Sequence, residues 1–190
     1  MKRKLCCGLY LAIWLAFPCA VFAVWCADYD LLIGTEWTAF RIQFVLNGIT
    51  ALIGAGFAVR RYLGSGRQFL NRLLLVLPLA GIAVLLLCTN GLCWFLDSAQ
   101  EYHSFRSPDK THTVVIMENV SLIAGRVTLC ERVNPFLIQA KAGVSTDDGH
   151  RPVCAGEYAL VWDGDTVTLT IADGMGGEKT ISAVLRQVGQ

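Results

Sequence analysis

Cysteine is the residue type in this chain of 190 residues whose chemistry would be most specific, and the chain has eight of them. Six lie inside or at the edges of long apolar windows, where a thiol most often serves as a small apolar side chain; they are Cys6, Cys7, Cys19, Cys26, Cys88 and Cys93. The other two, Cys130 and Cys154, form a candidate disulfide. We expect their part of the chain to lie outside the cytoplasm, as argued below from the charges, and such a compartment permits a disulfide. Two unpaired thiols are the alternative.

A redox activity is the enzymatic function that these cysteines suggest most directly. A membrane thiol oxidoreductase would pass electrons from Cys130 and Cys154 to Cys88 and Cys93. The chain has no Cys-x-x-Cys pair, which such chemistry usually uses. We therefore rank this activity third among the candidate functions and expect the protein not to be an enzyme.

The histidines do not follow the spacing of a metal site. His103, His112 and His150 lack the close pairs that zinc ligands show. Acidic side chains in two turns could offer oxygen atoms to calcium, but no EF-hand spacing accompanies them. We therefore expect no metal ion, no cofactor and no catalytic residue.

One turn near the C-terminus offers candidate contact residues. Trp162, Asp163 and Asp165 occur together, and an aromatic ring beside two carboxylates could bind a partner. Trp162 is also a candidate for the core, and this is the stronger of its two interpretations.

The apolar residues are concentrated in three windows without any charged residue, namely Leu5–Cys26, Ile42–Val59 and Leu73–Leu96. A helix of about 17–25 apolar residues spans a bilayer. The pattern predicts a membrane anchor over residues 1–96, with transmembrane helices near 5–26, 42–59 and 73–96. In an alternative interpretation the first window is a signal peptide cleaved after residue 23, because Val21-Phe22-Ala23 resembles its cleavage site.

The charges predict one orientation for these helices. Residues 1–96 contain eight basic and three acidic residues, a net charge of +5, whereas residues 97–190 contain eight basic and twelve acidic residues, a net charge of −4. The basic residues lie at the N-terminus and in the 60–72 segment, and basic loops stay on the cytoplasmic side. We therefore expect a multi-pass protein of the cell membrane with a cytoplasmic N-terminus and an extracytoplasmic C-terminal domain.

Small residues recur along the second apolar window. Residues of this size allow helix backbones to approach closely within lipid. The candidate helix-packing face consists of Gly48, Thr50, Ala51, Gly54, Ala55 and Ala58.

Residues 97–190 change to the pattern of β-strands. Val, Ile, Leu and Thr dominate short runs separated by turn residues, and two such runs flank Asp163-Gly164-Asp165, which is typical of a hairpin. The expected strands are 113–117, 121–130, 136–142, 158–162 and 166–171, with 179–188 as a strand or a short helix. The sequence predicts a small all-β domain, either sandwich-like or a rolled sheet.

Two segments of this domain are similar to a known kind of protein. Ser107–Thr113 begins with a Ser-Pro-Asp turn that leads into a strand, and Trp162–Val167 forms a Trp-containing hairpin. These features resemble the β-domain of small, uncharacterised bacterial multi-pass membrane proteins. The resemblance implies a membrane-anchored β-domain and no known activity.

The expected function is therefore binding or a structural role, performed by a non-catalytic β-domain outside the membrane. The alternative is an accessory subunit of a transporter or membrane enzyme complex that acts through its helices. The expected partners are the lipid bilayer and a membrane protein or a second copy of the chain. The charge distribution excludes a nucleic-acid-binding domain of the basic kind.

Overall fold

The computed structural model of the protein describes residues 2–64, 69–121, 124–147 and 149–186, and two compact units divide the chain. The first unit consists of Met1–Ala20 and Phe40–Asp97, and the second of Val21–Ala39 and Ser98–Gln190. The predicted boundary near residue 97 separates the helical part from most of the β part. The segment Val21–Ala39, however, belongs to the second unit.

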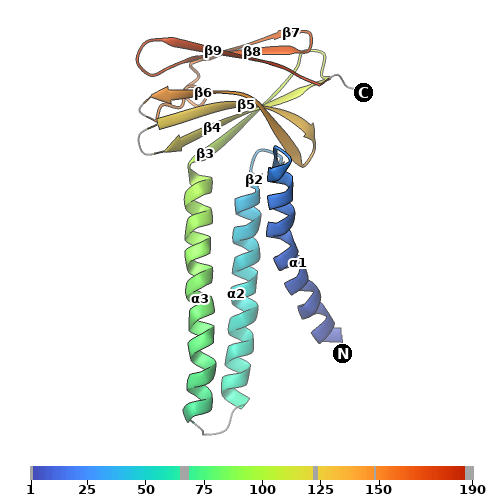
Figure 1. Cartoon of the computed structure of the whole chain (residues 1–190), viewed down its shortest axis with the longest axis vertical. Coiled ribbons are helices and arrows are strands. Elements are labelled where there is room, and N and C mark those ends of the chain that lie inside the picture. Colours follow the sequence, from blue (N-terminus) through green and yellow to red (C-terminus); the bar gives the residue numbers. More distant parts are fainter. Residues whose placement is uncertain (1, 65–68, 122–123, 148, 187–190) are drawn as a thin grey trace. The chain divides into compact units, whose positions relative to one another are not determined.

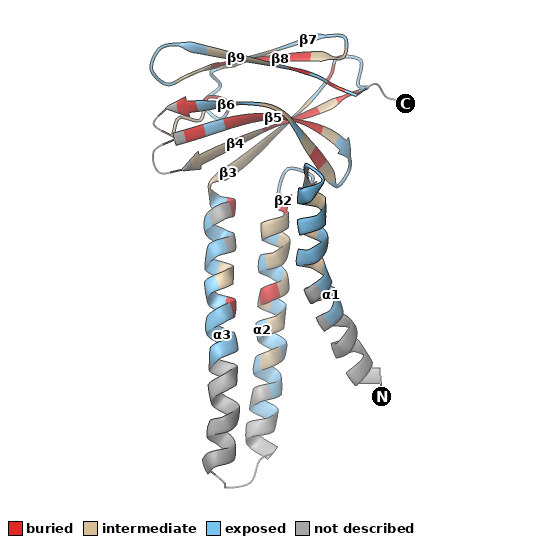
Figure 2. Cartoon of the chain, in the orientation of Figure 1, coloured by how far each residue is buried: buried red, intermediate tan, exposed pale blue. Residues whose placement is uncertain are grey.

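Three helices follow the three apolar windows: α1 is Lys2–Cys26, α2 is Ala39–Gly64 and α3 is Phe69–Ser98 (Figure 1). Within the described residues, one stretch, Ala39–Phe57, is long and apolar enough to cross a membrane, and Gly81–Leu92 is a shorter apolar helix. Insertion of three helices in a membrane therefore stays a prediction. Figure 2 shows that the described parts of the helices are largely exposed, whereas buried residues are concentrated in the strands.

Asn47 of α2 is the polar centre of the helical unit. Its side chain is 2% exposed and its Oδ1 atom accepts hydrogen bonds from Trp14 Nε1 (2.9 Å) and Gln43 Nε2 (2.8 Å). Its Nδ2 atom donates to Thr89 Oγ1 of α3 (3.4 Å). A buried amide needs such partners, because leaving it unpaired costs about 1–3 kcal/mol. Asn47 thus links α1, α2 and α3.

The small-residue face predicted on α2 does not make these contacts. No described atom of another element lies within 4 Å of the space that a Cβ at Gly48 or Gly54 would occupy. Ala51 and Ala55 are exposed, Thr50 donates a hydrogen bond to Leu46 O of its own helix, and the side chain of Ala58 lies outside the described part. The inter-helix hydrogen bonds run through Asn47 because a buried amide requires partners, whereas a glycine requires none.

The second unit contains two antiparallel sheets (Figure 1). The six-stranded sheet is strongly curled and has the order β2-β1-β6-β5-β4-β3. Its strands are β1 Tyr29–Ile33, β2 Trp37–Thr38, β3 Gln100–Arg106, β4 Thr113–Ser121, β5 Ala124–Asn134 and β6 Leu137–Asp147. The three-stranded sheet consists of β7 Tyr158–Asp163, β8 Thr166–Ala172 and β9 Glu178–Val184.

The main core lies between these two sheets. Successive residues of a strand point to opposite faces, and in β8 fully buried residues alternate with partly buried ones. In β4 and β5 residues of both faces are buried. The cluster comprises Val114, Ile116, Val127, Leu129, Val153, Val167, Leu169, Ile171, Ala183 and Leu185. The other face of the six-stranded sheet carries a smaller buried cluster of Leu32, Val115, Cys130 and Ile138. The structure thus confirms a mostly β unit with a curled sheet. The finer choice between a sandwich-like domain and a rolled sheet stays a prediction.

Several elements differ from the sequence prediction. The expected hairpin is present, with Asp163 opposite Thr166 and a positive φ of 55° at Gly164, as a two-residue turn requires. The segment 100–106 forms β3, and the segment between the first two helices forms β1 and β2, none of which was predicted. The segment 178–184 is a strand, and Ser121 ends β4 instead of opening β5.

Candidate functional site

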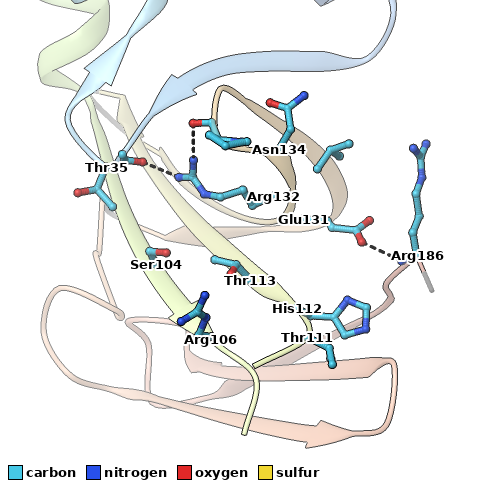
Figure 3. A pocket seen from close by; sticks show the side chains of 13 residues that line it. Thr35, Ser104, Arg106, Thr111, His112, Thr113, Glu131, Arg132, Asn134 and Arg186 are labelled. Carbon is cyan, nitrogen blue, oxygen red and sulfur yellow. Dashed lines mark hydrogen bonds between the residues drawn. The ribbon is translucent and has the colours of Figure 1, made fainter. Parts of the chain in front are cut away.

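A pocket of about 940 Å³ lies on the β unit, and Figure 3 shows its lining residues. It is formed where five short segments meet: the β1–β2 turn, the end of β3, the approach to β4, the end of β5 with the turn after it, and the residue Arg186 after β9. Three arginines line it, namely Arg106, Arg132 and Arg186. Its chemistry is therefore dominated by guanidinium groups.

Arg132 fixes the upper wall of the pocket in Figure 3. Its guanidinium donates to the carbonyl oxygens of Leu32 (3.2 Å), Gly34 and Pro135 (3.3 Å). Burial lowers the pKa of Arg132 from its usual value, and its guanidinium still carries its charge. These bonds join the β1–β2 turn to the turn that follows β5, so they position both turns.

The carboxylate of Glu131 lies in the wall with its own partners. Its Oε2 atom is 2.9 Å from Lys141 Nζ, and its Oε1 atom accepts a hydrogen bond from the backbone N–H of Arg186 (2.8 Å). The Arg186 guanidinium in turn donates to Tyr29 Oη (3.1 Å). Glu131 thus anchors the segment after β9, and Lys141 offsets its charge.

The Ser-Pro-Asp turn positions His112 in the pocket wall. Ser107 Oγ accepts the backbone N–H of His112 (3.0 Å), and the Ser107 hydroxyl donates to the Asp109 carboxylate. Hydrogen bonds from Ser107 and Thr111 lower the pKa of Asp109 to about 2. His112 is itself buried, and its Nε2 atom lies 3.1 Å from Asp165 Oδ1.

Arg106 gives the pocket a positive charge that is not paired with a carboxylate of the described residues. It is exposed at the end of β3, opposite Thr113 in the ladder, and the structure gives it no ion pair among the described residues. Arg132 is bonded to neutral carbonyl groups, which leave its charge in place. The wall therefore carries three cations against one carboxylate that is already paired with Lys141, and it favours an anionic ligand.

The structure separates the three predicted contact residues. Trp162 is partly buried and packs against the core between the sheets, which agrees with its alternative role. Asp163 is exposed in the hairpin. Asp165 contacts His112, which lines the pocket, whereas Asp165 itself does not line it.

The candidate disulfide between Cys130 and Cys154 is not formed, and both thiols are free. Cys130 is completely buried and lies opposite Val115, on the sheet face that points away from β7–β9. Cys154 is exposed, and its backbone N–H donates to Glu118, which lies on the other face. The sheet itself therefore separates the two sulfur atoms. Burial, with a smaller contribution from Asp30, raises the pKa of Cys130 to about 12.

The arginines of the pocket were not predicted as site residues from the sequence. They come from three distant segments, so no local spacing links them. The curled sheet brings Arg106 and Arg132 together, whereas Arg186 follows β9 of the other sheet and is held there by its backbone hydrogen bond to Glu131. A partial signal existed in the Ser-Pro-Asp turn, which leads directly to His112.

Comparison of the chain with known protein families, with curated proteins and with solved structures finds no match.

Proposed function

We propose that the protein is a multi-pass membrane protein whose extracytoplasmic β-domain is a non-catalytic binding module for a small anionic ligand. The pocket lined by Arg106, Arg132 and Arg186 carries this proposal. Its volume of about 940 Å³ falls within the range of about 300–1,000 Å³ that is typical of small-molecule sites.

The ligand class follows from the arginines. A guanidinium group presents a planar fork of donors that matches a carboxylate or a phosphate in two parallel hydrogen bonds. Arg106 has the freedom to reach a ligand, whereas Arg132 is held by three carbonyl groups and supplies a fixed positive charge. A small molecule with carboxylate or phosphate groups meets these requirements.

The membrane part of the proposal rests on the helices. Large apolar side chains are exposed on all three, including Phe22, Leu52, Leu87 and Trp94, and water disfavours so much apolar surface. A bilayer would cover this surface. The basic residues of the N-terminus and of the 60–72 segment would then lie in the cytoplasm, and the β-domain outside.

Anion binding by the full chain in detergent micelles tests the proposal. We expect calorimetric titration with citrate and with inorganic phosphate to detect binding of at least one of them, and glucose to give none. Arg106→Gln removes a charge-assisted hydrogen bond of about 1.5–3 kcal/mol, so the affinity falls about tenfold or more.

Arg126→Gln is the matched control, because Arg126 is exposed on β5 and does not line the pocket. It removes the same charge and leaves the affinity unchanged. The proposal is wrong if neither anion binds, or if both variants weaken binding equally.

The second candidate function is an accessory subunit that acts through its helices. The open space beside Gly48 and Gly54 favours it, because such a surface allows a partner helix to approach closely. Cross-linking in native membranes from residues 48–58 would capture a membrane protein or a second copy of the chain. Capture that persists in the Arg106→Gln variant would assign the interaction to the helices.

A further inference from the structure

A cluster of three metal-ligating side chains lies away from the arginine pocket, at the other end of β3. Glu101 and His103 belong to β3 and Glu118 to β4. Glu101 is directly opposite Glu118 in the ladder, and His103 is two residues further along, so all three side chains lie on one face of the sheet. Their ligand atoms all lie within 4.8 Å of one another.

The separations of these atoms suit a single ion. His103 Nε2 lies 3.2 Å from Glu118 Oε2 and 4.0 Å from Glu101 Oε2. Zinc binds nitrogen and oxygen ligands at about 2.0–2.2 Å, so two ligands of one ion are at most about 4.4 Å apart. Both separations fall within that reach.

The surroundings hold the two carboxylates in place. Glu118 is 1% exposed, and its two oxygen atoms accept the backbone N–H groups of Val153 (2.7 Å) and Cys154 (3.0 Å). Arg151 donates to Oε1 of Glu101, which leaves Oε2 facing His103. Ligating carboxylates are usually oriented by such outer hydrogen bonds, and each oxygen keeps a second lone pair for an ion.

The pairing of Glu101 with Glu118 brings two carboxylates close together, which favours a cation beside them. Like charges directly opposite each other on neighbouring antiparallel strands are destabilising. Arg151 offsets part of this repulsion at Glu101, and the Nε2 atom of His103 lies within 4.0 Å of an oxygen atom of each carboxylate. A divalent cation between them would convert the repulsion into attraction.

We propose that Glu101, His103 and Glu118 bind a divalent transition-metal ion, with Zn²⁺ as the best match for one imidazole and two carboxylates. Three protein ligands leave a fourth position for water or another ligand, as in open zinc sites. The ion would tie β3 and β4 to the segment that holds Val153 and Cys154. This site is separate from the arginine pocket and does not depend on anion binding there.

Zinc titration of the chelator-treated full chain in detergent tests this proposal. We expect the wild type to bind one more equivalent of Zn²⁺ than His103→Gln, as measured by competition with a chromophoric chelator. Zinc binding by the cysteines is the same in both proteins, because His103→Gln removes no thiol. A second readout is the melting temperature, which Zn²⁺ raises in the wild type and not in the variant, since an ion that binds the folded state stabilises it.

His150→Gln is the matched control, because His150 pairs with the carboxylate of Glu157 at 2.9 Å and belongs to no group of three metal-ligating side chains among the described residues. We expect His150→Gln to bind as many equivalents of Zn²⁺ as the wild type. Glu101→Gln changes a more exposed ligand and gives the same loss as His103→Gln even if the latter folds poorly. The proposal is overturned if His103→Gln and Glu101→Gln bind zinc like the wild type, or if His150→Gln loses the same equivalent.

Discussion

His112 Nε2 and Asp165 Oδ1 lie 3.1 Å apart, although 53 residues separate them along the chain. His112 precedes the first residue of β4, and Asp165 lies in the turn between β7 and β8, so this contact joins the two sheets at the edge of the core. The two residues belong to Ser107–Thr113 and Trp162–Val167, the two segments that carry the resemblance to bacterial β-domains. The fold brings these segments together beside the arginine pocket.

Removal of the Asp165 carboxylate is expected to destabilise the β unit. In Asp165→Ala the buried imidazole of His112 loses its partner, and an unsatisfied buried group costs about 1–3 kcal/mol. Asp163→Ala changes an exposed carboxylate in the same hairpin and serves as the control. Thermal unfolding of both variants checks this, and equal melting temperatures would contradict it.

Gly125 of β5 is expected to tolerate no side chain. A Cβ at this position would lie 2.1 Å from Thr146 Oγ1 and 3.1 Å from the carbonyl oxygen of His150. Thr146 is buried and its hydroxyl donates to that same carbonyl, so it has little room to move. Gly125→Ala should therefore cost about 1–3 kcal/mol of unfolding free energy.

Gly143→Ala on the neighbouring strand is the control for this change. There a Cβ would approach the end of the Arg126 side chain at 3.3 Å, which can move aside. Urea unfolding followed by tryptophan fluorescence should show a clear loss for Gly125→Ala and a smaller one for Gly143→Ala. The reverse order would show that β5 and β6 do not approach each other in this way.

The Asp109 carboxylate predicts a dependence of stability on acid pH. Its folded pKa of about 2 lies below the ordinary 3.8, so the unfolded chain takes up this proton first as the pH falls. The stabilisation is complete above about pH 4 and is lost between about pH 4 and pH 2. Asp109→Asn should melt below the wild type at pH 6, and the difference should vanish near pH 2. A difference that does not change with pH would contradict this.

The two thiols of the β unit should react very differently. Cys154 is exposed, whereas Cys130 is fully buried and keeps its proton because its pKa is raised to about 12. A membrane-impermeant maleimide applied to intact cells should label Cys154 and spare Cys130, as mapped by mass spectrometry. Labelling of Cys154 only after lysis would place the β-domain in the cytoplasm and overturn the proposed orientation. Labelling of Cys130 in the folded protein would contradict its burial.

The β-domain was predictable where a strand shows strict alternation or a turn has a specific chemistry. Val167, Leu169 and Ile171 point into the core and alternate with threonines, and Asp163-Gly164 requires a tight turn. β3 was missed because Glu101, His103 and Arg106 give it a polar composition. Glu101 and His103 point to the same face of the sheet as Glu118, and this is known only from the register of β3 with β4.

Neither candidate site was predictable from spacing. The carboxylates of Glu101 and Glu118 are 17 positions apart, and their contact depends on a ladder register that no local motif determines. The disulfide prediction was wrong for a related reason. The separation of Cys130 and Cys154 along the chain permits a bridge. The two cysteines lie on opposite faces of the six-stranded sheet, however, and the sheet prevents it.

The pairing of β1 with β6 has a consequence for how the chain folds. Tyr29 lies opposite Gln139, so the edge of the six-stranded sheet is completed by a segment that is synthesised more than a hundred residues earlier. Closing so large a loop is slow, and β1 can join the sheet only after β6 has been synthesised. A fragment that begins at residue 97 would lack β1 and β2 and would expose the backbone of β6 as an open edge, which invites association with other chains. The segment from β1 to β2 thus covers the edge of β6 from within the same chain.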